Sequence, residues 1–186
     1  MLVLLLHTLL MADGPTEPPP ACWLRDDPAD LELRISRFDS ASTVLDADTL
    51  KVCYSRPRKL DRPMGRLVPH GVPWRLGANE ATVLQTPIPL MIGEAEIPAG
   101  SYSLYAIPGP ERWELIVNGT TERWGVPLND QVRSADVDTA IAVVEPASQL
   151  MENFTMRFER RSATTVDLVW EWESTLVRVP IRRSDS

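Results

Sequence analysis

Histidine and cysteine are scarce in this chain of 186 residues, which contains two of each. His7 lies in an apolar N-terminal stretch, so His70 is the only histidine available to a folded domain. Zinc, copper or non-haem iron sites built from several histidines are therefore excluded, and two cysteines are too few for a four-cysteine metal site. We expect the protein to use no metal and no cofactor.

The chain also lacks the short motifs that mark nucleotide and serine-hydrolase chemistry. It contains neither GxGxxG nor GxxxxGK[ST], and the GxSxG turn is absent. Its 19 basic residues are outnumbered by 26 acidic ones, which gives a net charge of -7. A chain this acidic is poorly suited to nonspecific binding of nucleic acid or anionic lipid. We expect neither as a partner.

Glycine is half as common as proline, with 9 against 17 residues, and this ratio disfavours long helices. The hydrophobic fraction of 44% and the charged fraction of 24% are typical of soluble globular domains. A chain of this length can bury a sizeable core within one domain without metals or disulfides. The composition therefore predicts one folded domain with rigid loops.

The apolar N-terminal run is too short to cross a bilayer. Residues 1–11 read MLVLLLHTLLM, whereas a membrane-spanning helix needs about 20 apolar residues. The run is similar to the apolar part of a secretory signal, although no basic residue precedes it, and prolines follow at 15–20. We expect residues 1–21 to be a leader and spacer, the protein to be exported to the periplasm or beyond, and the mature chain to have no membrane span. Lipid attachment at Cys22 is not expected, because Pro19 and Pro20 do not fit a lipoprotein signal.

The two cysteines have two interpretations. Cys22 and Cys53 could pair in an oxidising compartment. Alternatively, Cys53 is a small buried side chain in the apolar strand Leu50–Tyr54, since free cysteine behaves as a small hydrophobe. The strand pattern favours the second interpretation.

The body of the chain, residues 38–182, has the pattern of short extended segments separated by turn residues. Their spacing is typical of an antiparallel β-sandwich or jelly roll. We therefore predict a single all-β domain at 38–182, preceded by a linker at 22–37, with one helical turn at Ala147–Met151. The predicted strands are Ser42–Leu45, Thr49–Tyr54, Thr82–Thr86, Ser101–Ile107, Trp113–Asn118, Thr139–Val144, Phe154–Arg160, Thr165–Ser174 and Leu176–Ile181. The six tryptophans are spread along the chain, which favours core packing over a ligand platform.

One connection is much longer than the others. Residues 54–82 read YSRPRKLDRPMGRLVPHGVPWRLGANEAT, and loops of this length inside a domain are usually functional or disordered. Leu67, Val68 and Trp74 predict that this loop is ordered and packed against the sheet. We expect its polar and aromatic side chains to gather in one place as a ligand site. The candidate ligand-binding residues are Arg56, Arg66, His70, Trp74, Arg75, Asn79 and Glu80.

The same loop carries a family resemblance. In order along the chain, the segments that carry it are Tyr54–Pro57, Gly65–Gly71, Trp74–Thr82, Ala99–Leu104, Trp113 with Asn118, Trp124-Gly125 and Trp170-Glu171. Over about residues 38–181 the chain resembles a bacterial family known as domain of unknown function 2911. The resemblance implies a β-sandwich-like domain, common in exported proteins, without an established activity. At Ser55 the family often has glycine and at His70 it often has tyrosine, so a mechanism that needs a phenol at position 70 is not supported.

Three roles for the polar residues of the loop remain open. The first is structural: an ion-pair network that fixes the loop. Three arginines and Glu80 leave two unbalanced positive charges, and burying them would require Asp61, backbone carbonyls or a bound anion to neutralise them. The second is a binding site in which arginine forks hold an anionic or carbohydrate ligand. The third is a hydrolase in which Glu80 is the general acid or base, His70 assists it, and Asn79 or Arg75 stabilises an oxyanion. We expect a structural or ligand-binding module, with the hydrolase as the alternative.

Overall fold

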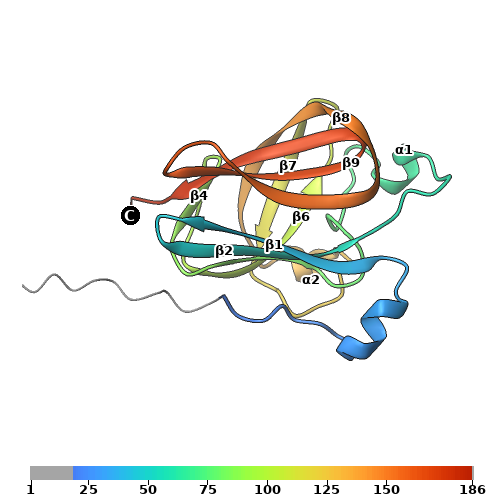
Figure 1. The fold of residues 1–186 in the computed structure, drawn as a ribbon, viewed down its shortest axis with the longest axis horizontal. Coiled ribbons are helices and arrows are strands. Elements are labelled where there is room, and N and C mark those ends of the chain that lie inside the picture. The colour runs from blue at the N-terminus through green and yellow to red at the C-terminus, as the bar shows by residue number, and fades with distance from the viewer. Residues whose placement is uncertain (1–18, 186) are drawn as a thin grey trace, which may run out of the picture.

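A computed structural model describes residues 19–185, so residues 1–18 of the leader and spacer predicted at 1–21 lie outside the described residues. Within that part, nine strands form a single antiparallel sheet in the order β1-β2-β3-β6-β7-β8-β9-β4-β5 (Figure 1). The strands are β1 (Arg37–Leu45), β2 (Asp48–Arg56), β3 (Thr82–Thr86), β4 (Leu90–Ile92), β5 (Ala95–Ile97), β6 (Gly100–Ile107), β7 (Arg112–Asn118), β8 (Asp136–Arg160) and β9 (Thr165–Arg183). The helices are the 3₁₀ helix η1 (Pro28–Leu33), α1 (Met64–Leu67) and α2 (Asp130–Arg133). The prediction of an all-β fold is confirmed.

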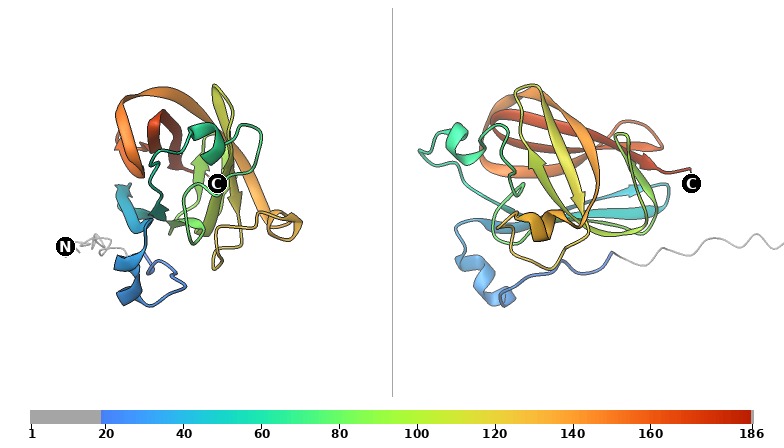
Figure 2. Two further views of the ribbon diagram at one scale, coloured as in Figure 1. Left: turned by 90° about the vertical axis from the view of Figure 1, so that its right-hand side faces the viewer. Right: turned by 180° about the vertical axis from the view of Figure 1, so that it is seen from behind.

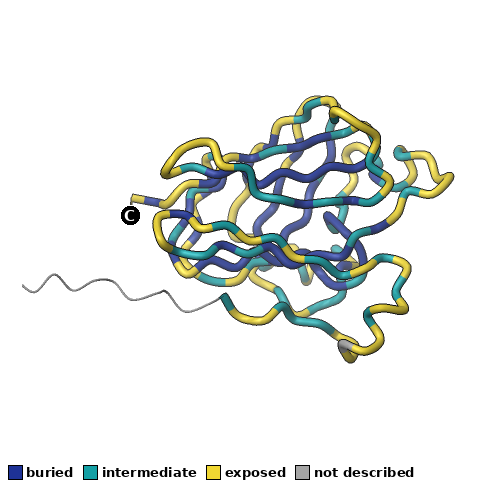
Figure 3. Tube along the Cα trace, viewed as in Figure 1, coloured by how far each residue is buried: buried dark blue, intermediate teal, exposed yellow. Residues whose placement is uncertain are grey.

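The sheet curls around one core rather than splitting into two separate sheets. Figure 2 shows β6 and β7 on the side of the interior opposite β1 and β2. Strand β8 links the two sides of the curl, because its first part pairs with β7 and the rest with β9. Irregularities between Pro146 and Thr155 interrupt the pairing with β9, and such bulges bend a strand. Alternate side chains of the strands point inward, where Phe154, Trp170 and Leu104 are fully buried. Figure 3 shows long buried stretches, in dark blue, along the strands.

The hairpin between β1 and β2 has a two-residue turn. Leu45 pairs with Asp48, and both residues between them, Asp46 and Ala47, have positive φ values of 56° and 103°. Turns with two positive φ values match the right-handed twist of the strands they join. The predicted strands Ser42–Leu45 and Thr49–Tyr54 are therefore joined by a turn one residue shorter than the gap between them.

Strands β8 and β9 are much longer than predicted. Each strand joins two segments that the sequence pattern predicts as separate strands. The prediction of a helical turn at Ala147–Met151 is wrong, because these residues belong to β8. The register between β8 and β9 shifts between Pro146 and Met151 and again before Thr155, so the pairing continues past the proline. Strands β4 and β5 have three residues each, too few for alternation to be recognised.

The long loop is ordered and packed down, as predicted. Trp74 and Ala106 of β6 exchange two backbone hydrogen bonds of 2.7 and 2.8 Å. Glu80 forms a second isolated bridge with Trp124. The first bridge fixes the second half of the loop to the sheet, and the second joins it to the connection between β7 and α2. Helix α1 stands at the outer end of the loop (Figure 1).

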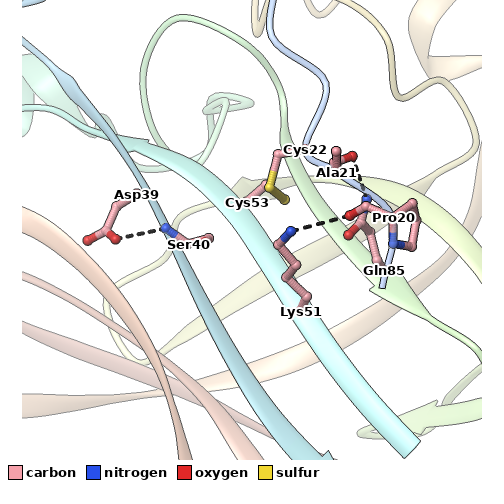
Figure 4. Close-up of a disulfide and its surroundings, with 8 residues drawn as sticks. All are labelled: Pro20, Ala21, Cys22, Asp39, Ser40, Lys51, Cys53 and Gln85. Atoms are coloured by element: carbon pink, nitrogen blue, oxygen red, sulfur yellow. Dashed lines mark hydrogen bonds between the residues drawn. A yellow bond between two sulfur atoms is a disulfide. The ribbon is translucent and has the colours of Figure 1, made fainter. Parts of the chain in front are cut away.

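The segment at 19–36, here called the N-terminal strap, lies along β2 and β3. A disulfide joins Cys22 to Cys53 of β2, with a Cα–Cα distance of 5.9 Å (Figure 4). Lys51 Nζ and Gln85 Nε2 donate hydrogen bonds to the carbonyls of Pro20 and Ala21. The interpretation of Cys53 as a free buried thiol is therefore wrong, because the pattern of one strand does not reveal a strap that comes from 31 residues away.

Candidate functional site

Glu80 lies beneath the strap rather than in a cluster of loop arginines. Its carboxylate accepts hydrogen bonds of 2.8 Å from both Nη1 and Nη2 of Arg34, and one of 3.1 Å from the backbone N–H of Arg25. The side chains of Glu80 and Arg34 are 5% and 11% exposed. Burial raises the pKa of Glu80, but the hydrogen bonds from Arg34 and from backbone N–H groups outweigh this effect and hold the pKa below its usual range.

Asn79 and Arg75 help to hold the same corner together. Asn79 has a φ of 59°, and its Nδ2 donates a hydrogen bond to the carbonyl of Ser36 at the end of the strap. Arg75 Nε donates to the carbonyl of Gly77, and burial lowers the pKa of this guanidinium. The guanidinium carbons of Arg25 and Arg34 lie 5.5 and 5.9 Å from the ring centroid of Trp124. The Asn79-Glu80 pair therefore serves as the docking site of the strap.

The structure divides the seven predicted site residues among several places. Arg56 lies at the end of β2 and bonds to β8, whereas Arg66 is exposed on α1. His70 and Trp74 line a cavity that contains none of the other five. The expected single cluster is therefore absent, because the partner of Glu80 is Arg34, which comes from the strap instead of the loop.

That cavity, here called the aromatic cavity, has a volume of about 580 Å³. It lies between the α1 part of the loop, the turn at Gly109-Pro110, and the inner faces of β7, β8 and β9. Its lining residues are mostly apolar: Met64, Gly65, Val68, Pro69, His70, Trp74, Gly109, Pro110, Trp113, Val144, Phe154, Trp170, Trp172, Thr175 and Val177. Four tryptophans and a phenylalanine thus surround one space.

The aromatic rings are held in fixed mutual positions. Trp74 stacks on Trp172 with centroids 5.9 Å apart and an interplanar angle of 21°. The edge-to-face partners of Trp74 are Trp113 at 5.9 Å and Phe154 at 5.4 Å. Trp170 tilts against Trp113 with a centroid distance of 5.9 Å. Such pairs stabilise one another beyond simple area burial, so the walls of the cavity are preorganised.

Simple strand geometry brings these rings together. Trp170 and Trp172 are two residues apart on β9, so both point to the inner face. Trp113 on β7 points inward from the opposite side, and the backbone bridge to Ala106 places Trp74 between them. The prediction that tryptophans pack in the core is confirmed for the three on the strands. The same rings also line the cavity, which sequence reasoning missed, although two tryptophans on one strand face beside the Trp74 loop were a usable signal.

One polar group of the cavity wall has no partner. Trp170 is 1% exposed, and its Nε1 makes no hydrogen bond within the described residues. Trp172 differs, since its Nε1 donates to the carbonyl of Glu152 at 3.1 Å. Leaving a buried N–H unpaired costs about 1–3 kcal/mol, so a group that accepts this hydrogen bond would bind favourably. Among residues 19–185, no Asp, Glu, Lys or Arg lines the cavity.

Between residues 19 and 185, no group of three or more His, Cys, Asp or Glu side chains could hold a metal ion. Over the same residues, no helix has the length and apolar character needed to span a membrane.

Comparison with known proteins adds a family. The model of the family described as "Protein of unknown function (DUF2911)" matches residues 36–181. The chain belongs to this family. No curated protein and no solved structure matches the chain. All residues that line the aromatic cavity fall within the DUF2911 match, whereas strap residues 19–35 precede it.

Proposed function

We propose that this DUF2911 protein binds a small, neutral, largely apolar molecule in the aromatic cavity. The observation that carries the proposal is a cavity of about 580 Å³ lined by four tryptophans and a phenylalanine, where the Nε1–H of one lining residue, Trp170, has no partner among residues 19–185. Ligand sites in proteins are usually concave, apolar spaces of about 300–1,000 Å³ with a few polar groups that fix orientation. The cavity has this size and this lining.

The chemistry of the ligand follows from the lining. Stacked indole rings favour a flat or apolar surface, and Trp170 favours a carbonyl or ether oxygen that accepts a hydrogen bond. A carbohydrate would bring many hydroxyl groups, whereas apart from the indole N–H groups the polar side chains of the lining are those of His70 and Thr175. An anion would find no charged side chain here. The anionic or sugar-like ligand expected from the loop is therefore not favoured at this cavity.

The hydrolase alternative receives less support. A general acid or base must reach the substrate, but Glu80 does not line the cavity that contains His70. The Glu80 carboxylate is also fully occupied by Arg34 and the N–H of Arg25. A binding role needs no such group.

The function can be tested with two compounds of similar size, coumarin and naphthalene, of which only coumarin has a carbonyl. We expect both to quench tryptophan fluorescence. Replacing Trp170 with Phe keeps a ring but removes the donor, so coumarin affinity should fall by about fivefold, the value of one hydrogen bond of about 1 kcal/mol. Naphthalene affinity should change much less.

The matched control is Trp124→Phe, which changes a tryptophan outside the cavity. It should leave the binding of both compounds unaltered. The proposal fails if neither compound binds the wild-type protein, or if Trp124→Phe weakens binding as much as Trp170→Phe does.

We also infer that the protein is exported. The disulfide between Cys22 and Cys53 supports this inference, because such bonds persist in oxidising compartments and are rare in the cytosol. A tagged full-length protein should occur in the periplasm or medium, and thiol alkylation should detect no free cysteine. A cytosolic protein with two reactive thiols would contradict the inference.

A further inference from the structure

A second hollow, here called the arginine hollow, lies at the junction of the strap with β1, β2 and β8. It has a volume of about 370 Å³ and shares no residue with the aromatic cavity. In Figure 1 the blue η1 helix and the start of β1 mark this corner of the molecule. Four of its seven lining residues are arginines, and one is acidic: Glu32, Arg34, Ile35, Arg37, Arg56, Arg58 and Asn153.

The arrangement of the arginines is electrostatically unfavourable on its own. Arg37 of β1 and Arg56 of β2 are direct partners in the strand register. Side chains of directly opposed residues lie close together on one face, and like charges there destabilise a sheet. Arg58 follows two residues after Arg56 and forms an isolated bridge with Asn153, so it adds a third charge nearby. An anion between these side chains would relieve the repulsion.

Two of the four guanidinium groups are already occupied. Arg34 binds Glu80 and Asp26 at 2.8 and 2.7 Å. Arg56 donates to the carbonyl of Phe154 and to Thr155, and its Nη1 is 3.3 Å from Asp39.

The other two guanidinium groups are available. Arg58 is 3.9 Å from Glu152, and both side chains are about half exposed. An ion pair with this geometry contributes little to stability. Arg37 forms no ion pair with any residue between 19 and 185. Glu32, the one acidic lining residue, is exposed and forms no ion pair in that part of the chain either. The hollow therefore has more positive charge in its lining than negative charge.

We propose that the arginine hollow binds a small, multiply charged oxyanion, with Arg37 and Arg58 as its principal ligands. Guanidinium groups bind carboxylate and phosphate oxygens through paired hydrogen bonds, and such charge-assisted bonds are about twice as strong as neutral ones. Asn153 supplies a neutral amide, and Arg56 adds positive charge from the wall. This site is independent of the aromatic cavity, so either proposal can fail alone.

The test is calorimetric titration with pyrophosphate and with citrate, each at constant ionic strength. We expect saturable binding of at least one of them to one site. The anion that binds more tightly identifies phosphate or carboxylate as the preferred group. Arg37→Ala and Arg58→Ala should each weaken that binding by about tenfold or more. The matched control is Arg66→Ala, an exposed arginine on α1 outside the hollow, which should leave affinity unchanged.

Thermal unfolding without anion separates a binding role from a structural one. Because Arg37 opposes Arg56, Arg37→Ala should melt at the same temperature as the wild type or higher, while the preferred anion should raise the wild-type Tm. The proposal is overturned if neither anion binds saturably or if Arg66→Ala weakens binding as much as Arg37→Ala. It is also overturned if Arg37→Ala alone lowers Tm by several degrees.

Discussion

Replacing Glu80 with glutamine should lower the free energy of unfolding by about 3 kcal/mol. The substitution leaves the guanidinium of Arg34 buried without its main counter-ion, since Asp26 contacts the same group from an exposed position. Breaking a buried ion pair by removing one partner usually costs about 3–5 kcal/mol, and the remaining contact with Asp26 places the expected loss at the lower end. Urea unfolding monitored by tryptophan fluorescence would measure the change.

The control for charge loss is Glu94→Gln, which removes a carboxylate from the exposed turn between β4 and β5. It should alter stability by less than about 0.5 kcal/mol. A double-mutant cycle with Arg34→Met should give a coupling energy of about 1 kcal/mol or more, because the two groups share hydrogen bonds. A Glu80→Gln variant as stable as the wild type would show that the pair is not important for the fold.

The same pair predicts a dependence on pH. The pKa of Glu80 is lower in the folded protein than in the unfolded chain. Its contribution to stability is therefore complete above the ordinary glutamate pKa of about 4.3 and is lost as the pH falls through the lower folded value. The stability difference between wild type and Glu80→Gln should be constant near neutral pH and shrink below about pH 4.

Local sequence patterns identified the parts of the fold that depend on near neighbours. Strand β6 was recognisable because Tyr102, Leu104 and Ala106 alternate with polar residues, and β7 because Trp113–Asn118 is an almost continuous apolar run. Along β9, the same alternation places Val166, Leu168, Trp170 and Trp172 on one face, and all four are buried. These features need no knowledge of distant residues, which explains why the all-β class and most strand positions could be predicted.

Features that join distant segments were not recoverable in this way. Arg34 is 46 residues from Glu80, and no local pattern links them. The partner of Cys53 lies on the strap, a segment that composition suggested was only a linker. The aromatic cavity combines rings from β7, β8, β9 and the loop. The sequence correctly indicated the loop, because His70 and Trp74 line the cavity. The strand residues that complete the lining are brought there by the curl of the sheet, which the sequence pattern does not show.

Removing the disulfide should cost about 3–4 kcal/mol of unfolding free energy. The bond joins cysteines separated by 31 residues, and closing a loop of that length restricts the unfolded chain considerably. The measurement is urea unfolding of the oxidised protein against the protein reduced with dithiothreitol. A Cys22→Ser, Cys53→Ala variant should match the reduced protein and should not respond to dithiothreitol. A reduced protein within about 1 kcal/mol of the oxidised one would contradict this expectation.

Loss of the disulfide should also change the effect of Glu80→Gln, since both contacts hold the strap. With the bond intact, the strap stays near β2 even when Arg34 loses its partner. In the reduced protein only non-covalent contacts remain, among them the Arg34–Glu80 pair and the hydrogen bond from Asn79 to Ser36. Reduction together with Glu80→Gln should therefore release the strap while the sheet stays folded. Hydrogen exchange of the Arg25 amide, which is bonded to Glu80, should then rise well before exchange in β2. Equal protection of both amides would mean that the strap and the sheet unfold as one unit.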